Sequence, residues 1–308
     1  MGAEVFLFFK ACLNEIYHFG RKKMKNVIIG MLAFTVVFWN LENFMDCRKA
    51  GRKYSFYRKC EAVCKEIFRM EDELGDLPDA VGFAEVEDSF VVWSLLKTTL
   101  LRKTPYSFIH YDSPDHRGID CVLLYRRDRL RLLNSKPNHV CDSLGRVMAT
   151  RDILLGSFET RDSARVDILV NHHPSQIGGK TEGRNAAKAC MQRLCDSLAS
   201  FSGTIVSIGD FNEGPGWKCG GMKDLSENSI GSGSIRFNGE WELIDRCYTD
   251  TLTEGRMRVF DDSVLTEPDS VHGGEKPRRT AIGPRYNGGV SDHYPIVVEL
   301  DLKARNRR

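Results

Sequence analysis

The residues of this 308-residue chain best suited to chemistry are Asp210 and Asn212, which stand two positions apart in Ser207-Ile208-Gly209-Asp210-Phe211-Asn212. They follow the apolar, β-branched run Thr204-Ile205-Val206. Because side chains alternate between the two faces of an extended chain, residues two positions apart point to the same side. A carboxylate and a carboxamide placed in this way can hold one water molecule, metal ion or phosphate oxygen together.

Four further polar clusters border apolar runs in the same way. They are Asn40-Leu41-Glu42-Asn43 after Phe34 to Trp39, Glu85 after Ala80 to Ala84, Asn171-His172-His173 after Val166 to Val170, and Ser291-Asp292-His293 before Pro295 to Val298. Short apolar runs of this kind are typical of buried strands. Five polar clusters at strand ends therefore predict the rim of one active site.

The segments that must position these clusters alternate at first between strand and helix. The hydrophobic periodicity predicts strands at 33–39 and 80–85 and helices at 48–70 and 89–101. Five short strand-like runs follow with only turns between them, which indicates an antiparallel arrangement. These runs are 106–111, 121–125, 130–133, 152–158 and 166–170.

The second half of the chain continues with a helix at 182–199, for which Thr181 is a suitable cap, and a strand that ends at Asp210. The glycine- and serine-rich stretch 214–239 predicts a long surface loop beside the site. Strands are expected again at 241–244 and 294–302. These strands are more than one sheet comfortably holds, so we expect an α/β fold: a four-layer sandwich of two mixed β-sheets packed face to face, with helices on the outer faces.

Composition is that of an ordinary folded domain, with 42% hydrophobic and 28% charged residues. The net charge of +2 is too small to indicate nucleic-acid binding by itself. The ten cysteines lack CxxC spacings, which favours reduced thiols over disulfides or zinc ligands. No stretch has the roughly 20 uninterrupted apolar residues that a membrane span requires, and nothing in the sequence indicates an oligomeric state.

We expect one domain at 33–302, preceded by a signal-like extension at 1–32 and followed by a basic tail at 303–308. The basic group Lys22 to Lys25 and the apolar run 27–33 imitate a signal peptide. However, cleavage near Ala33 would leave almost no spacer before the first strand. We therefore expect a cytoplasmic protein, and export by this segment is the alternative.

Taken in order, these motifs resemble those of the endonuclease/exonuclease/phosphatase superfamily, which includes deoxyribonucleases, abasic-site endonucleases, inositol polyphosphate phosphatases and sphingomyelinases. The matching residues are Phe38 to Asn43, Glu85, Asn171-His172, Gly209 to Asn212 and Ser291 to Pro295, within about 33–302. The resemblance implies an enzyme that hydrolyses phosphate esters with a divalent cation, usually Mg²⁺, with Mn²⁺ as a substitute.

The resemblance also implies a role for each motif residue. Glu85 matches the principal metal carboxylate, and Asn40, Glu42 and Asp292 match positions that help to hold the metal. Asp210 matches the general base, Asn212 its partner in orienting water, His293 and His172 two phosphate-contacting histidines, and Asp245 the carboxylate that orients His293. His172 is also a candidate proton donor to the leaving oxygen, while His173 should face the other way.

Glu85 taken alone could also be a turn cap. Four further residues could line a phosphate-binding edge or could form ordinary surface pairs: Arg117, Asp120, Arg184 and Asn185. The histidines at 172–173 depart from the tyrosine and asparagine usual in abasic-site enzymes. We therefore expect a nuclease or other phosphodiesterase acting on nucleic acid or another phosphodiester. The alternatives are a phosphomonoesterase for a small molecule or lipid headgroup, a calcineurin-like enzyme, whose Gly-Asn-His box is missing, and a binding scaffold without catalysis.

Overall fold

The computed structural model describes residues 34–50, 53–176, 181–214, 216–229, 233–283 and 285–302. The expected N-terminal extension, 1–32, and basic tail, 303–308, lie outside these ranges. Among the described helices, none combines the length and the apolar character that crossing a membrane requires. The nine described cysteines are free thiols, and all but Cys141 are buried.

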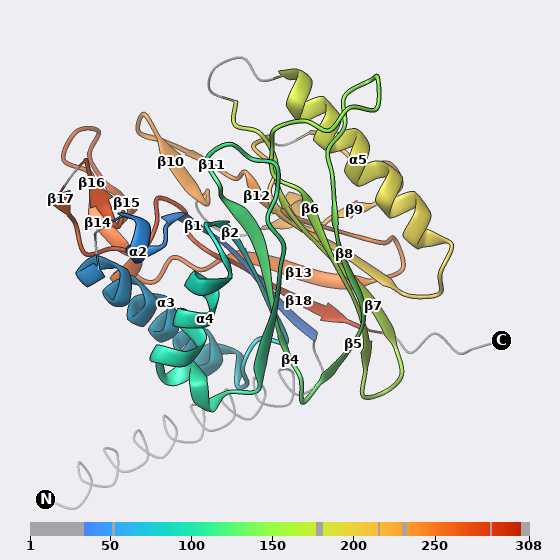
Figure 1. Ribbon diagram of the computed structural model, residues 1–308, viewed down its shortest axis with the longest axis horizontal. Coiled ribbons are helices and arrows are strands. Elements are labelled where there is room, and N and C mark those ends of the chain that lie inside the picture. The colour runs from blue at the N-terminus through green and yellow to red at the C-terminus, as the bar shows by residue number, and fades with distance from the viewer. Residues whose placement is uncertain are drawn as a thin grey trace, which may run out of the picture.

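Two six-stranded sheets form the centre of the molecule (Figure 1). The first has the order β13 (Glu254–Val259), β18 (Ile296–Asp301), β1 (Phe34–Phe44), β2 (Ala80–Val86), β4 (Asp120–Arg126), β3 (Tyr106–His110). The second has the order β5 (Leu130–Asn138), β6 (Ile153–Thr160), β7 (Arg165–His172), β8 (Thr204–Asp210), β12 (Asp245–Thr249), β9 (Lys223–Asp224). In each sheet one central pair is parallel, β1 with β2 and β7 with β8, so both sheets are mixed.

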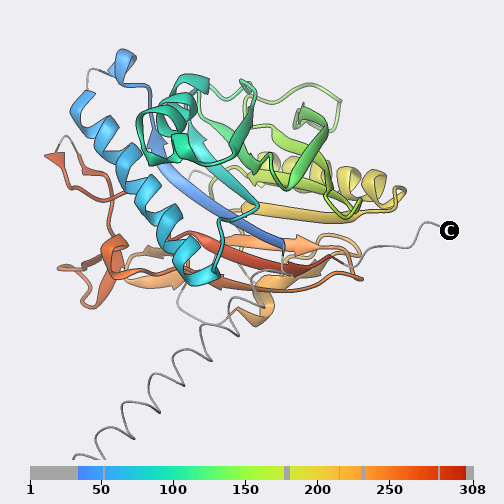
Figure 2. The ribbon, with the colours of Figure 1, turned by 90° about the horizontal axis from the view of Figure 1, so that it is seen from below.

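Helices cover the outer faces of both sheets (Figure 2). The first sheet is covered by α3 (Lys53–Leu74) and α4 (Ser89–Thr98), with α2 (Cys47–Ala50) and the 3₁₀ turn η1 (Leu100–Lys103) beside them. The second is covered by α5 (Thr181–Ala199). The expected four-layer sandwich is thereby confirmed.

Three small hairpins lie outside the two main sheets. They are β10 (Ile235–Phe237) with β11 (Glu240–Glu242), β14 (Thr266–Pro268) with β15 (Glu275–Pro277), and β16 (Ala281–Ile282) with β17 (Arg285–Tyr286). Two further 3₁₀ turns are η2 (Leu225–Asn228) and η3 (Ser263–Leu265). In Figure 1 the hairpins gather at the end of the sandwich where β1 leads into α2.

The core between the sheets is built from alternate residues of neighbouring strands. In β7, Ile168 and Val170 belong to the core shared with the first sheet, whereas Leu169 packs on the α5 side. A Cβ atom on Gly82 of β2 would lie 3.2 Å from Val170, so the two sheets approach closely here. Because side chains alternate along a strand, His172 at the end of β7 faces the space between the sheets.

Some elements differ from the expected ones. The predicted helix at 48–70 is described as α2 and α3, and the helix predicted to reach 101 ends at Thr98, followed by η1. The expected surface loop at 214–239 contains β9, η2 and β10, and β12 and β13 were missed. Short strands such as β9 are held by pairing with β12 rather than by local propensity, which explains why periodicity did not reveal them.

Glu66 on α3 predicts a pH dependence of stability. Its side chain is buried, its Oε2 has no hydrogen-bond partner among the described residues, and its Oε1 lies 3.6 Å from Arg69 Nε. Burial raises the pKa of Glu66 to about 7 from an ordinary 4.5. Between these values the unfolded chain binds fewer protons than the folded protein, so stability falls as pH rises.

Glu66→Gln removes the ionisable group and should raise the free energy of unfolding by about 2 kcal/mol at pH 8, with little change at pH 5. Urea denaturation of both proteins at the two pH values measures this difference. An equal change at both values would show that the effect arises from packing rather than from ionisation.

Candidate active site

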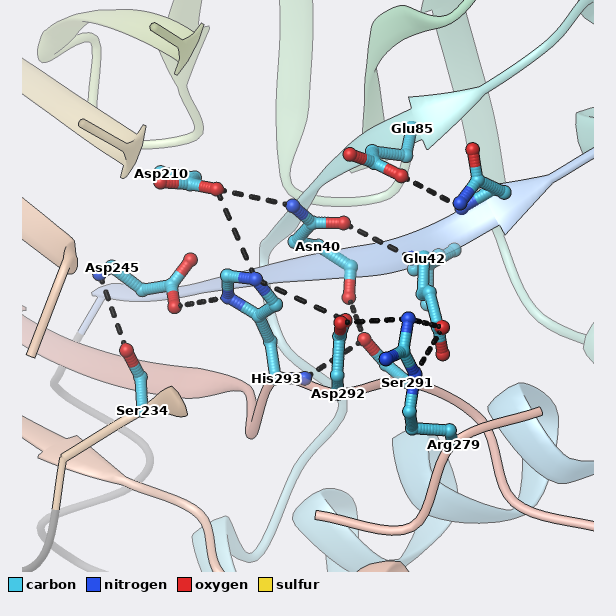
Figure 3. A network of polar contacts seen from close by, with 12 residues as sticks. Asn40, Glu42, Glu85, Asp210, Ser234, Asp245, Arg279, Ser291, Asp292 and His293 are labelled. Atoms are coloured by element: carbon cyan, nitrogen blue, oxygen red, sulfur yellow. Dashed lines mark hydrogen bonds and ion pairs between the residues drawn. The ribbon is translucent and has the colours of Figure 1, made fainter. Parts of the chain in front are cut away.

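The strand pairings bring the predicted clusters to one edge of the sandwich (Figure 3). In the first sheet β1 and β2 run parallel with Asn40 opposite Ala84, which places Glu85 next to Asn40. In the second sheet β7 and β8 run parallel with His172 opposite Asp210. Parallel strands end at the same edge, so both pairs present their polar residues there.

Two antiparallel strands bring the remaining clusters to this edge. The first residue of β12, Asp245, pairs with Asp210 at the end of β8. In the first sheet β18 runs antiparallel to β1, with Ile296 opposite Phe38, so the residues before Ile296 lie beside the end of β1. The Ser291 hydroxyl donates to the Asn40 carbonyl at 2.6 Å and fixes this approach.

Asp210 lies at the centre of the site. Asn40 Nδ2 donates to its Oδ2 at 3.1 Å, and the backbone N–H of Asn212 donates to its Oδ1 at 2.9 Å. Burial raises the pKa of Asp210 to about 7, and the charge of Asp245 contributes to the increase. A carboxyl group that titrates near neutrality is suited to accept a proton from water.

The close approach of β7 and β8 depends on Gly209. A Cβ atom at this position would lie 2.2 Å from the carbonyl oxygen of Asn171 on β7. Any other residue would push the two strands apart next to Asp210. The glycine in the Gly-Asp-Phe-Asn motif therefore has a packing role that supports the site.

His293 is fixed as a charged group. Its Nδ1 lies 2.7 Å from Asp245 Oδ2, and Trp39 Nε1 donates to its carbonyl at 2.9 Å. Burial alone would lower the pKa of His293, but the charges of Asp245 and Asp210 outweigh burial and raise it to about 10. Its Nε2 lies 4.0 Å from Asp210 Oδ2, too far for a hydrogen bond, so it remains free to donate to a substrate oxygen.

His172 differs from His293 in charge. Its Nε2 lies 3.7 Å from Asp210 Oδ2 and 3.8 Å from Glu85 Oε1. Burial, aided by the charges of Arg151 and Arg117, holds the pKa of His172 well below its ordinary value. It is therefore a neutral imidazole at neutral pH.

His173 and Asn212 stand beside this centre. The His173 ring packs against Phe211 and Trp217, at centroid distances of 5.0 and 6.1 Å, on the α5 side. The ring therefore faces away from His172, as the strand alternation predicts. Asn212 Nδ2 donates to the His173 carbonyl at 2.9 Å, which fixes its carboxamide next to Asp210.

Glu85 lies on the other side of Asn40. Its Oε2 accepts the backbone N–H of Asn43 at 2.8 Å, and its Oε1 lies 3.7 Å from Arg117 Nη2. The φ angles are 62° at Glu85, 45° at Glu42 and 49° at Asn43. Left-handed conformations are strained for glutamate, although asparagine tolerates them, and they are commonly concentrated at functional sites.

Buried Lys59 on α3 supports this strained turn. Its ammonium group donates to the carbonyls of Leu41 and Glu42, the latter at 2.9 Å. Burial is the main reason that the pKa of Lys59 falls to about 8. The sequence pattern gives no sign of this role for Lys59, because a lysine within an amphipathic helix is usually solvated.

The predicted metal residues offer only oxygen donors, on Glu85, Glu42, Asp292 and Asn40. Glu42 Oε2 is buried without a hydrogen-bond partner among the described residues, as expected of an oxygen that can ligate a cation. Oxygen donors of this kind fit a hard divalent ion such as Mg²⁺ or Mn²⁺, which also keeps several waters. The residues present therefore suit such an ion.

These carboxylates do not form a compact three-ligand cluster. In the described part of the chain, His, Cys, Asp and Glu ligand atoms lie within 4.8 Å of one another in two groups, His110–Asp112–Asp120 and Asp210–Asp245–His293. In the second group His293 is hydrogen-bonded to Asp245, so we interpret it as a catalytic unit rather than a metal site. The carboxylate of Asp120 belongs to the first group and lies 3.2 Å from His110 Nε2. Glu85 belongs to neither group.

Three arginines complete the surroundings of the site. Arg117 reaches Glu85, and buried Arg151 donates to the carbonyls of His172 and His173. Arg279 pairs with Glu42, and no motif in the sequence identified it or Arg151. Arg184, by contrast, contacts Ser175 and Glu213.

Comparison with known proteins shows the family to which the chain belongs. The model of a family described as "Endonuclease/Exonuclease/phosphatase family" matches residues 35–227. The chain belongs to this family and is thereby a hydrolytic phosphoesterase, of a kind that generally uses a divalent metal. No curated protein sequence matches the chain.

Solved structures share the fold at low sequence identity. The catalytic domain of human Nocturnin, with a bound sulfate, has a TM-score of 0.61 at 16% identity, covering 89% of this chain and 94% of that one. A mannosyl-6-phosphatase of Bacteroides thetaiotaomicron has a TM-score of 0.59 at 18% identity, covering 87% and 99%. TDP2 of D. rerio, complexed with a single-strand DNA product, has a TM-score of 0.58 at 14% identity, covering 87% and 98%.

Proposed function

We propose that the protein is a divalent-metal-dependent phosphodiesterase, of the nuclease type, that activates water for direct attack on phosphorus. The observation that carries this proposal is the position of Asp210, whose Oδ2 lies 3.7 and 4.0 Å from the Nε2 atoms of His172 and His293. A base and two hydrogen-bond donors then face one small space, which is what hydrolysis of a phosphate ester requires.

Each residue has a distinct part in this reaction. Asp210 accepts a proton from the attacking water, and the fixed carboxamide of Asn212 orients that water. His293, held charged by Asp245, donates to a non-bridging phosphate oxygen as negative charge builds on it. His172, as a neutral imidazole, donates a hydrogen bond from Nε2 to the phosphate or to the leaving oxygen and does not transfer a proton to it.

Glu85 would be the principal residue for holding Mg²⁺ or Mn²⁺, with the Asn40 carboxamide beside it. Glu42 and Asp292 border this position and pair with Arg279. Such an ion, when bound, neutralises phosphate oxygens and lowers the pKa of bound water. Arg117 has a partly exposed side chain, 42% accessible, next to Glu85. A guanidinium group in this place is suited to a phosphate of the nucleic-acid backbone.

A panel of substrates tests the proposal. We expect Mg²⁺-dependent cleavage of bis-para-nitrophenyl phosphate and of DNA or RNA, abolished by EDTA, and much weaker hydrolysis of para-nitrophenyl phosphate and sugar phosphates. Activity confined to the monoesters would replace the nuclease by a phosphomonoesterase. Absence of hydrolysis across the panel, with correctly folded protein and added metal, would favour a non-catalytic scaffold.

A further inference from the structure

Arg279 reaches the site from a part of the chain that contributes no motif. It lies between β15 and β16, in the excursion 260–290 that separates β13 from Ser291. Its Nε donates to Glu42 Oε1 at 2.5 Å, and its Nη2 contacts that oxygen and also lies 3.2 Å from Asp292 Oδ2. Figure 3 shows the guanidinium between the two carboxylates.

The backbone around Arg279 is tied to the segment that leads into Ser291. Gly289 N donates to the Arg279 carbonyl at 3.1 Å, and Val290 N donates to the Arg278 carbonyl at 2.9 Å. A Cβ atom on Gly289 would lie 1.9 Å from the Arg278 carbonyl oxygen, so this close pairing requires glycine. The backbone of Arg279 is therefore held next to the segment that carries Asp292, from which its half-exposed side chain reaches Glu42 and Asp292.

The two sides of Asn40 differ in charge balance. On one side Glu42 is compensated by Arg279 and by the buried ammonium group of Lys59, which binds the Glu42 carbonyl. On the other side Glu85 has its nearest cationic group, Arg117, at 3.7 Å, and this arginine is also 3.8 Å from Asp115. Glu42 is thus paired directly with a cationic side chain, whereas Glu85 has only a longer contact of this kind and is the better placed of the two carboxylates for an added cation.

We propose that Arg279 is the built-in cation of this active site: it neutralises Glu42 and Asp292, limits the site to one divalent ion at Glu85, and binds the substrate phosphate. Arg279 contacts Glu42 and Asp292 through Nε and Nη2. The two N–H groups of Nη1 can therefore donate to a phosphate oxygen. The phosphate-binding part rests on the proposed function, whereas the effect on metal stoichiometry does not.

Metal binding tests the first part with the full-length chain and Mn²⁺ alone. Electron paramagnetic resonance titration should give one tightly bound Mn²⁺ per wild-type chain and two per Arg279→Gln chain, because the glutamine removes the only side-chain cation that pairs directly with both Glu42 and Asp292 among the described residues. Arg285→Gln is the matched control, since Arg285 lies exposed in the same excursion, and should give one ion. Two ions in the wild type, or one in Arg279→Gln, would overturn the proposal.

Phosphate binding tests the second part. In the presence of Mg²⁺, calorimetric titration with inorganic phosphate should show about tenfold weaker binding by Arg279→Gln, the size expected for losing a charged hydrogen bond. Arg279→Lys keeps the positive charge but loses the planar guanidinium group with its several N–H donors. This variant should bind one Mn²⁺, and its affinity for phosphate should lie between those of the wild type and Arg279→Gln. Equal phosphate affinity in all three proteins would overturn this part.

The outcomes separate this proposal from the proposed function. If no phosphate ester in the substrate panel is hydrolysed, the proposed function fails, yet the Mn²⁺ stoichiometries still decide whether Arg279 acts as a built-in cation. If the panel succeeds and the stoichiometries are equal, only the inference about Arg279 fails. Near-ultraviolet circular dichroism of each variant shows whether it has kept the native fold.

Discussion

Asp210→Asn should lower kcat for phosphodiester hydrolysis by about a thousandfold, within the range known for removal of a general base. Asparagine keeps the shape of the side chain and an oxygen for the Asn212 N–H, but it cannot accept a proton from water. Because Asp210 is buried with a raised pKa, its carboxylate lowers the stability of the fold at alkaline pH. The variant should therefore unfold at a temperature no lower than that of the wild type at pH 8.

Steady-state kinetics with bis-para-nitrophenyl phosphate and a thermal melt measure both effects. Asp162→Asn is the matched control, because Asp162 is exposed at the turn between β6 and β7 and contacts no site residue named here. It should behave like the wild type in both assays. A kcat for Asp210→Asn within tenfold of the wild-type value would remove Asp210 from the role of base.

His293→Gln should lower kcat by about a hundredfold to a thousandfold, because the site loses a preorganised donor to the developing charge on phosphate. Asp245→Asn should have a smaller effect, since the imidazole remains but loses the 2.7 Å contact that orients and charges it. In both variants KM should change little, because the interaction grows mainly in the transition state.

The double variant separates a positioning role for Asp245 from an independent one. If Asp245 acts only through His293, then His293→Gln with Asp245→Asn should be no slower than His293→Gln alone. Multiplied losses in the double variant would show that Asp245 contributes separately. The comparison requires all three variants at saturating substrate.

The fold class, and the edge of the sandwich at which the polar clusters meet, could be predicted from the sequence because both depend on local patterns. Apolar runs that end in polar residues mark strands that end at a site, and the parallel pairs β1–β2 and β7–β8 place two such ends together in each sheet. Alternation along β7 also predicted the opposite orientations of His172 and His173, which the packing of His173 on Phe211 confirms.

The cationic residues of the site could not be predicted in this way. Lys59 belongs to a helix, Arg151 precedes a strand, and Arg279 lies in an excursion with no regular pattern. Each reaches the site only through tertiary packing, and each side chain bears a charge that is equally common on a solvated surface. Their roles appear only in contacts such as that of Arg279 with Glu42, which are 237 positions apart.

The different charge partners of the predicted metal residues also could not be predicted from motif spacing. Only the family resemblance distinguished Glu85, as the principal metal carboxylate, from Glu42. The structure adds a physical difference, because Glu42 pairs with Arg279 and Glu85 has longer cationic contacts. Glu42 and Glu85 adopt left-handed backbone conformations that the glutamate residue type does not indicate. Motif order therefore located the site, whereas its charge distribution required coordinates.

Turnover in ¹⁸O-labelled water shows whether this edge of the sandwich directs water onto phosphorus. With bis-para-nitrophenyl phosphate and Mg²⁺, the wild type should release para-nitrophenyl phosphate carrying one ¹⁸O per turnover, and Asp210→Asn should form this product about a thousandfold more slowly. Equal rates of labelling by the two proteins would contradict the account, because water activation would then not depend on Asp210.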